Sequence, residues 1–127
     1  MPDGTPGASF DPPAVVARAF ATQDEEVTNV SLPRLSGALP EGLRGVLYRN
    51  GPGTLEAFGT RYQHPFDGDG MIRRYAIEGD AVRYTNRYVR TRERHEEAQA
   101  GRMLYRGFGT NLPGGLRRNG LRMRFKN

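Results

Sequence analysis

Histidines and carboxylates are the side chains in this 127-residue chain with the chemistry to bind a metal ion or move a proton. The two histidines are His64 and His95, and they lie far apart in the sequence. His64 stands in a His-Pro-Phe turn, where an imidazole typically hydrogen-bonds to the backbone. His95 stands among charged residues and is expected to be solvated. We therefore predict no metal ligand and no catalytic residue in this chain.

Residues 67–70 read Asp-Gly-Asp-Gly, and Glu78 follows at the twelfth position, as in a calcium-binding EF-hand loop. The fifth and sixth positions of that loop would be Met71 and Ile72, where calcium binding needs an oxygen ligand and a glycine. The calcium hypothesis is therefore disfavoured. We expect the two aspartates to accept backbone N–H groups in a tight turn that the two glycines make possible.

The residues after this turn alternate in polarity, which predicts β-strands. Met71, Arg73, Tyr75 and Ile77 fall on one face, and a short turn at 78–80 separates them from a second alternating run. The two runs predict a β-hairpin, with Val82, Tyr84 and Tyr88 on one face of its second strand. Further strands are predicted at 27–32, 34–38, 45–50 and 102–106.

Helices are expected to be few and short. The charged run 92–100 ends at Gly101, which suits a helix C-cap, and Arg92 can pair with Glu96 one turn later. Residues 1–25 are predicted to be a flexible leader, with a short helix over 12–20.

The composition narrows the class of protein. There are 17 Gly and 9 Pro, which favours short strands joined by tight turns, and no Cys, which excludes disulfides and thiol chemistry.

No apolar run approaches the ~20 residues of a membrane-spanning helix, and no secretory signal pattern is present, so a cytoplasmic location is expected. The net charge of +5 comes mostly from arginines dispersed among acidic residues. No nucleic-acid partner is therefore predicted.

Three segments in order, residues 39–53, 63–91 and 101–110, carry a family resemblance. Together with their surroundings, residues 26–127, they resemble the carotenoid cleavage oxygenases. The resemblance implies an all-β fold: the N-terminal strands and first blade or blades of a seven-bladed β-propeller, with short helices. Members are several times longer, so the chain is expected to be an incomplete N-terminal part, inactive by itself.

The resemblance also implies a function and site residues. The parent would be an iron-dependent dioxygenase that uses O2 to cleave a C=C bond of an apolar polyene, with Fe(II) held by four histidines outside this segment. Phe66 and Phe108 would line the substrate tunnel, unless they are ordinary core residues. Leu116, Leu121 and Phe125 would face a membrane, unless they form a solvated loop. The alternative is a non-catalytic small β-domain that binds an apolar ligand or a membrane surface.

Overall fold

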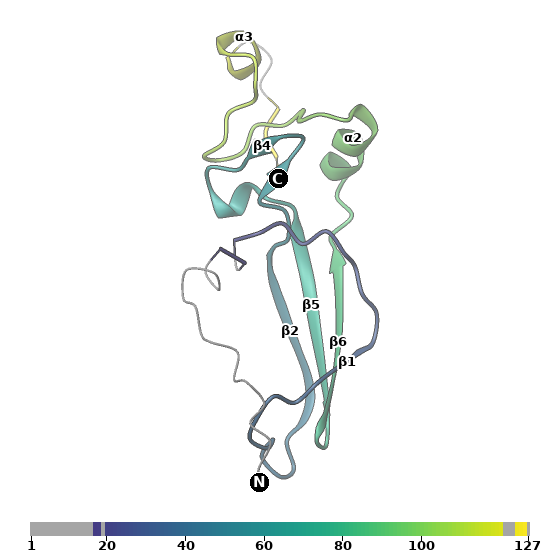
Figure 1. Cartoon of the computed structure of the whole chain (residues 1–127). Helices are drawn as coiled ribbons and strands as arrows, with labels where there is room; N and C mark the ends of the chain where they lie inside the picture. Colours follow the sequence, from purple (N-terminus) through teal and green to yellow (C-terminus); the bar gives the residue numbers. More distant parts are fainter. Residues whose placement is uncertain (1–16, 19, 121–123, 127) are drawn as a thin grey trace.

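The computed structural model describes residues 17, 18, 20–120 and 124–126. Its main element is a four-stranded antiparallel sheet in the order β1-β6-β5-β2 (Figure 1). The strands are β1 (Val30–Leu32), β2 (Arg44–Pro52), β5 (Gly70–Glu78) and β6 (Ala81–Tyr88). The long strands form one half of the molecule, and the helices gather at the other end (Figure 1). The predominance of sheet agrees with the all-β expectation.

The predicted hairpin is confirmed as β5 and β6. The two strands are joined by Gly79 and Asp80, and Gly79 adopts φ 65°, a left-handed conformation that favours glycine. Tyr75 lies directly opposite Tyr84, and the centroids of their rings are 5.0 Å apart. This cross-strand aromatic pair helps to fix the register.

The end of the molecule beyond the sheet holds the short elements. A two-residue hairpin pairs β3 (Glu56–Ala57) with β4 (Thr60–Arg61), and a 3-10 turn, η1 (Pro65–Asp67), follows. The helix α2 (Arg92–Ala100) has the predicted bounds, with Gly101 in the left-handed conformation at its C-cap. The helix α3 (Leu116–Asn119) was not predicted.

Three strand predictions need correction. The strand predicted at 27–32 forms only at Val30–Leu32, and none forms at 34–38, where Pro33 lacks a backbone donor and Gly37 turns the chain at φ 68°. The strand predicted at 102–106 is reduced to a single bridge between Arg106 and Phe125. Of the helix predicted at 12–20, only 17, 18 and 20 lie within the described residues, and 17 and 18 are helical.

An extended segment, residues 22–29, connects the sheet to the other end through hydrogen bonds. The Asn86 side chain, which is buried, accepts a bond from the Val27 N–H and donates one to the Glu25 carbonyl. The Thr22 hydroxyl accepts bonds from the N–H groups of Leu55 and Glu56. The part of the predicted leader nearest the sheet is therefore bonded to the rest of the fold.

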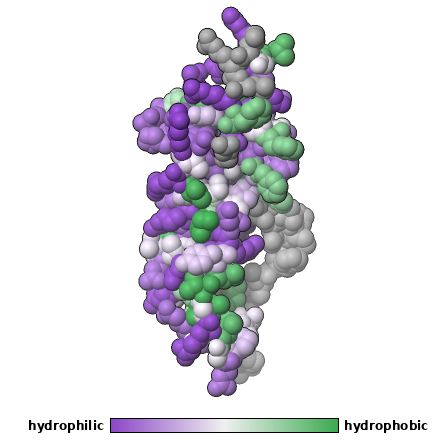
Figure 2. Space-filling model, turned by 180° about the vertical axis from the view of Figure 1, so that it is seen from behind, coloured by the Kyte–Doolittle hydropathy of each residue, from purple (hydrophilic) through white to green (hydrophobic). Residues whose placement is uncertain are grey.

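The apolar core is small. Buried Tyr62, Met103 and Leu112 form its main cluster, at the end beyond the sheet. In contrast, several large apolar side chains of the sheet are exposed, including Val30, Leu32 and Leu47. Figure 2 shows apolar surface both on the sheet and at the helical end. No helix in the part of the chain that the structure describes is long and apolar enough to cross a membrane.

Candidate functional site

The candidate site lies where the η1 turn meets the loop 107–110, two segments about 40 residues apart in sequence. His64 is the N-cap of η1: its backbone is extended, and its Nδ1 accepts a hydrogen bond of 3.2 Å from the Phe66 N–H. Pro65, at the first position of the turn, has no donor that would need a partner. The prediction that His64 hydrogen-bonds to backbone in a turn is confirmed.

Asp67 fastens the two segments together. Its carboxylate accepts hydrogen bonds from the Phe108 N–H, from the Gly109 N–H at 3.0 Å and from the Thr110 hydroxyl at 2.7 Å. Burial, with only 3% of the residue exposed, acts to raise its pKa, but these donors outweigh burial and hold the pKa below its ordinary value. Asp67 accepts backbone N–H groups as predicted, but they belong to the 107–110 loop rather than to its own turn.

Two glycines allow this close approach. A Cβ atom at Gly107 would lie 2.3 Å from the carboxylate carbon of Asp67, and one at Gly109 would lie 2.8 Å from the Cβ of His64. Neither distance is sterically possible without movement of the neighbours. The glycines of the Gly-Phe-Gly-Thr sequence are therefore needed for packing against the η1 turn, and this explains the spacing of that motif.

The aromatic side chains of this site point outward together. Phe66 and Phe108 are 84% and 85% exposed. The ring of His64 contacts both edge-on, with centroid distances of 4.9 Å to Phe66 and 5.4 Å to Phe108. The structure thus places the two predicted tunnel residues in one cluster around His64, and neither is packed within the described part of the fold.

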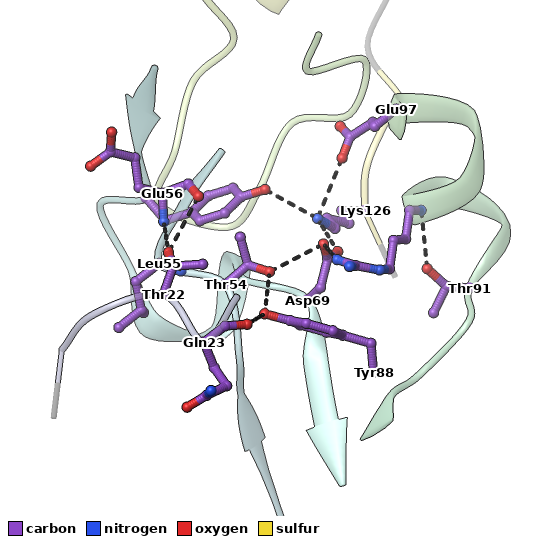
Figure 3. Close-up of polar contacts among 12 residues, drawn as sticks. Thr22, Gln23, Thr54, Leu55, Glu56, Asp69, Tyr88, Thr91, Glu97 and Lys126 are labelled. Atoms are coloured by element: carbon purple, nitrogen blue, oxygen red, sulfur yellow. Dashed lines mark hydrogen bonds and ion pairs between the residues drawn. The ribbon is translucent and has the colours of Figure 1, made fainter. Parts of the chain in front are cut away.

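A network of charged side chains surrounds Asp69, two residues after the η1 turn (Figure 3). Asp69 forms ion pairs of 2.6 Å with both Arg94 and Lys126, and Lys126 lies 3.5 Å from the buried carboxylate of Glu97. The Lys126 ammonium also donates to the Tyr62 hydroxyl at 3.3 Å. Burial acts to lower the pKa of Lys126, but the hydrogen bond and charge of Asp69 outweigh burial and raise it.

The network corrects the prediction for Asp69, which binds side-chain cations instead of backbone donors in its own turn. It also involves residues that the sequence did not single out, among them Lys126. A cavity of about 100 Å³ separates it from the aromatic cluster, with Phe66, Phe108, Asp69 and Lys126 among its lining residues. The aromatic cluster and the ionic network are therefore neighbouring parts of one region.

The remaining predicted residues lie elsewhere. Leu116, on α3, is 88% exposed, and Phe125, next to Lys126, is 57% exposed. Leu121 lies outside the described residues. His95 is exposed on α2. Among residues 17, 18, 20–120 and 124–126, no group of three or more His, Cys, Asp or Glu side chains is arranged to hold a metal ion, so these residues do not fit an iron site.

The fold and the aromatic turn can now be compared with known proteins. The model of the retinal pigment epithelial membrane protein family matches residues 20–127, and the chain belongs to this family. This confirms the resemblance to the carotenoid cleavage oxygenases that the three motifs indicated.

Individual relatives support the assignment. The chain is 38% identical to the apocarotenoid-15,15'-oxygenase of Synechocystis over 128 aligned residues, covering 99% of the chain and 26% of that protein. It is 34% identical to the carotenoid isomerooxygenase of Galleria mellonella over 68% of the chain and 17% of that protein.

Solved structures agree. A mutant of the Synechocystis apocarotenoid oxygenase superimposes on the chain with a TM-score of 0.80 at 38% identity, covering 91% of the chain and 24% of the solved chain. A cobalt-substituted form of the same oxygenase also has a TM-score of 0.80. The chain thus spans about a quarter of the length of the Synechocystis oxygenase and about a sixth of the Galleria mellonella protein.

Proposed function

We propose that this chain supplies part of the substrate-binding wall of an oxygenase that cleaves a C=C bond of a carotenoid or apocarotenoid, using O2 and giving two carbonyl products. The observation that carries the proposal is the 38% identity to the Synechocystis apocarotenoid-15,15'-oxygenase over 99% of the chain. The exposed pair Phe66 and Phe108 supports it, because flat aromatic rings provide an apolar wall for a long, rigid polyene.

The chain's own residues would bind and orient the polyene rather than react with it. The cobalt-substituted relative supports a metal-dependent reaction, but the described residues of this chain form no cage for the ion. We therefore expect the four histidines that hold Fe(II) to lie outside residues 1–127. The purified chain should bind no stoichiometric iron and should cleave no carotenoid. Iron at one equivalent per chain would contradict this expectation.

The sheet would be one blade, or part of one, in a seven-bladed β-propeller. Two features support this proposal. Strand β2 is one of the two edge strands of the sheet, and its residues from Arg44 to Asn50 are exposed. The two outer strands carry exposed apolar side chains, Val30 and Leu32 on β1 and Leu47 on β2, as expected of a sheet that packs against other parts of a larger protein.

We further propose that Leu116, Leu121 and Phe125 contact a membrane surface from the cytoplasmic side. Leu116 and Phe125 are exposed, and Leu116 is followed by Arg117 and Arg118, which suit an anionic surface. Replacing the three apolar residues by Ser should reduce binding to vesicles of anionic lipid by about tenfold or more. Leu35→Ser is the control, because Leu35 is 94% exposed on a different loop. Equal vesicle binding by both variants would contradict membrane contact.

The function is tested by a chimera in which this chain replaces the matched quarter of the Synechocystis oxygenase. The purified chimera is assayed with apocarotenoids and with longer carotenoids, and its iron content and melting temperature are measured. Cleavage to two carbonyl products supports the proposal. A folded, iron-loaded chimera that cleaves no polyene overturns it. Binding of a polyene by the 127-residue chain without cleavage by the chimera would favour the alternative, a non-catalytic apolar-ligand domain.

A further inference from the structure

The ring of His64 contacts two aromatic side chains that the proposed function places against the substrate. Its edge contacts with Phe66 and Phe108 are of similar length, 4.9 and 5.4 Å, and of similar angle, 68° and 69°. We propose that His64 is a specificity-determining spacer: it sets the separation of the two rings and thereby which double bond of the polyene is presented for cleavage. This inference rests on the proposed function.

His64 is fixed from two sides, so its ring is a rigid spacer. Its Nδ1 is held by the hydrogen bond from the Phe66 N–H, and its Cβ faces the backbone of Gly109, where even one added carbon atom would clash. The carboxylate of Asp67 also holds the 107–110 loop against the η1 turn, because it accepts hydrogen bonds from three donors of that loop. A change in the size of the residue at position 64 therefore acts on the aromatic rings, because the backbone on both sides is already fastened.

The spacing matters because a conjugated polyene is rigid and its double bonds are chemically similar. Binding energy along an apolar wall fixes how far the polyene slides before reaction. A displacement of about 1 Å at the reacting atoms can cost about 100-fold in rate. A wall whose two rings move apart would hold the polyene in more than one position and so produce a mixture of products.

The competing explanation is that His64 only caps the η1 turn, and the two roles can be separated by substitution. His64→Asn keeps a side-chain acceptor at the N-cap, because Asn is among the preferred N-cap residues, but removes the ring. His64→Phe keeps a ring and removes the acceptor. A spacer role predicts that the ring decides product distribution, whereas a capping role predicts that the acceptor decides stability and nothing else changes.

The test uses the chimera with the Synechocystis oxygenase and measures the product ratio, kcat, KM, melting temperature and iron content. His95→Asn is the matched control, since it makes the same substitution at an exposed histidine on α2. We expect His64→Asn to retain the wild-type melting temperature and iron content. It should raise KM by about tenfold and release a second pair of carbonyl products. His64→Phe should melt at a lower temperature but return the product ratio towards wild type.

The outcomes distinguish the spacer from the proposed function itself. If the unmutated chimera cleaves no polyene while folded and loaded with iron, the proposed function fails and the spacer fails with it. If the unmutated chimera is active and His64→Asn matches it in KM and product ratio, only the spacer is overturned. If His64→Asn and His95→Asn change the product ratio equally, the effect is not specific to position 64 and the spacer is again overturned.

Discussion

Replacing Asp67 by Asn tests whether the η1 turn and the 107–110 loop are held together by a charged acceptor. The buried carboxylate accepts three hydrogen bonds, and a bond to a charged group contributes about 1.5–3 kcal/mol. The Asn oxygen can still accept two neutral bonds, but its NH2 group faces a third donor. After allowing for the easier burial of a neutral side chain, we expect a loss of about 3 kcal/mol in the free energy of unfolding at pH 7.

The pH dependence gives a second, independent measure of the same contact. The pKa of Asp67 is held below its ordinary value of about 3.9, so its ionised form stabilises the folded state fully above that value. The contribution is lost as the pH falls through the lowered pKa. The difference in stability between wild type and Asp67→Asn should therefore be constant above about pH 5 and should shrink as the pH falls below about 4.

Urea unfolding of the 127-residue chain, followed by circular dichroism at a series of pH values, measures both quantities. Asp80→Asn is the control, because Asp80 is exposed in the turn between β5 and β6 and makes the same change of charge. Asp80→Asn should change the free energy of unfolding by no more than about 0.5 kcal/mol. A loss below about 1 kcal/mol for Asp67→Asn, or a difference from wild type that does not change below about pH 4, would show that the charge of Asp67 does not hold the two segments together.

Two further predictions concern the same region. Gly107→Ala should lower the free energy of unfolding by more than about 2 kcal/mol, because the added Cβ would clash with the Asp67 carboxylate. Gly51→Ala is the control: the nearest atom to its added Cβ would be 3.7 Å away, so the loss should be less than about 1 kcal/mol. Equal losses for the two variants would contradict the packing argument. Lys126→Met should cost about 3 kcal/mol by leaving the buried carboxylate of Asp69 with less compensation. Because the pKa of Lys126 is raised, its charged ammonium should stabilise the folded state up to above about pH 10, and this stabilisation should disappear as the pH rises further. If the loss of stability in Lys126→Met did not depend on pH, the ion pair would not be its cause.

The features that the sequence predicted well are those encoded locally. The hairpin of β5 and β6 follows from alternation on both sides of a glycine turn, and the helix α2 follows from Thr91, which caps its first turn, and Gly101, which ends it. His64 belongs to the same group, because its hydrogen-bond partner is only two residues away. In each case the determining interactions lie within a few residues.

The features that the sequence did not predict depend on contacts between distant segments. Asp67 and Asp69 share one short motif, yet Asp67 binds a loop 41 to 43 residues away while Asp69 pairs with cations on α2 and near the C-terminal end. Nothing in the alternation of polar and apolar residues distinguishes the two. Lys126 is similarly hidden in a basic run, and its burial is decided by the bridge that places Phe125 beside Arg106.

The distribution of exposed apolar residues separates two kinds of surface on this chain. The register places Leu47, Tyr75, Tyr84 and Val30 in one row across all four strands, with Ile77, Val82 and Leu32 in the adjacent row. Several of these side chains are exposed, and such a continuous apolar strip is typical of a surface that packs against protein. Phe66 and Phe108 differ, because they project from rigid loops rather than from a sheet. Packing explains the strip across the sheet, and contact with an apolar substrate is the role that we propose for the two exposed rings.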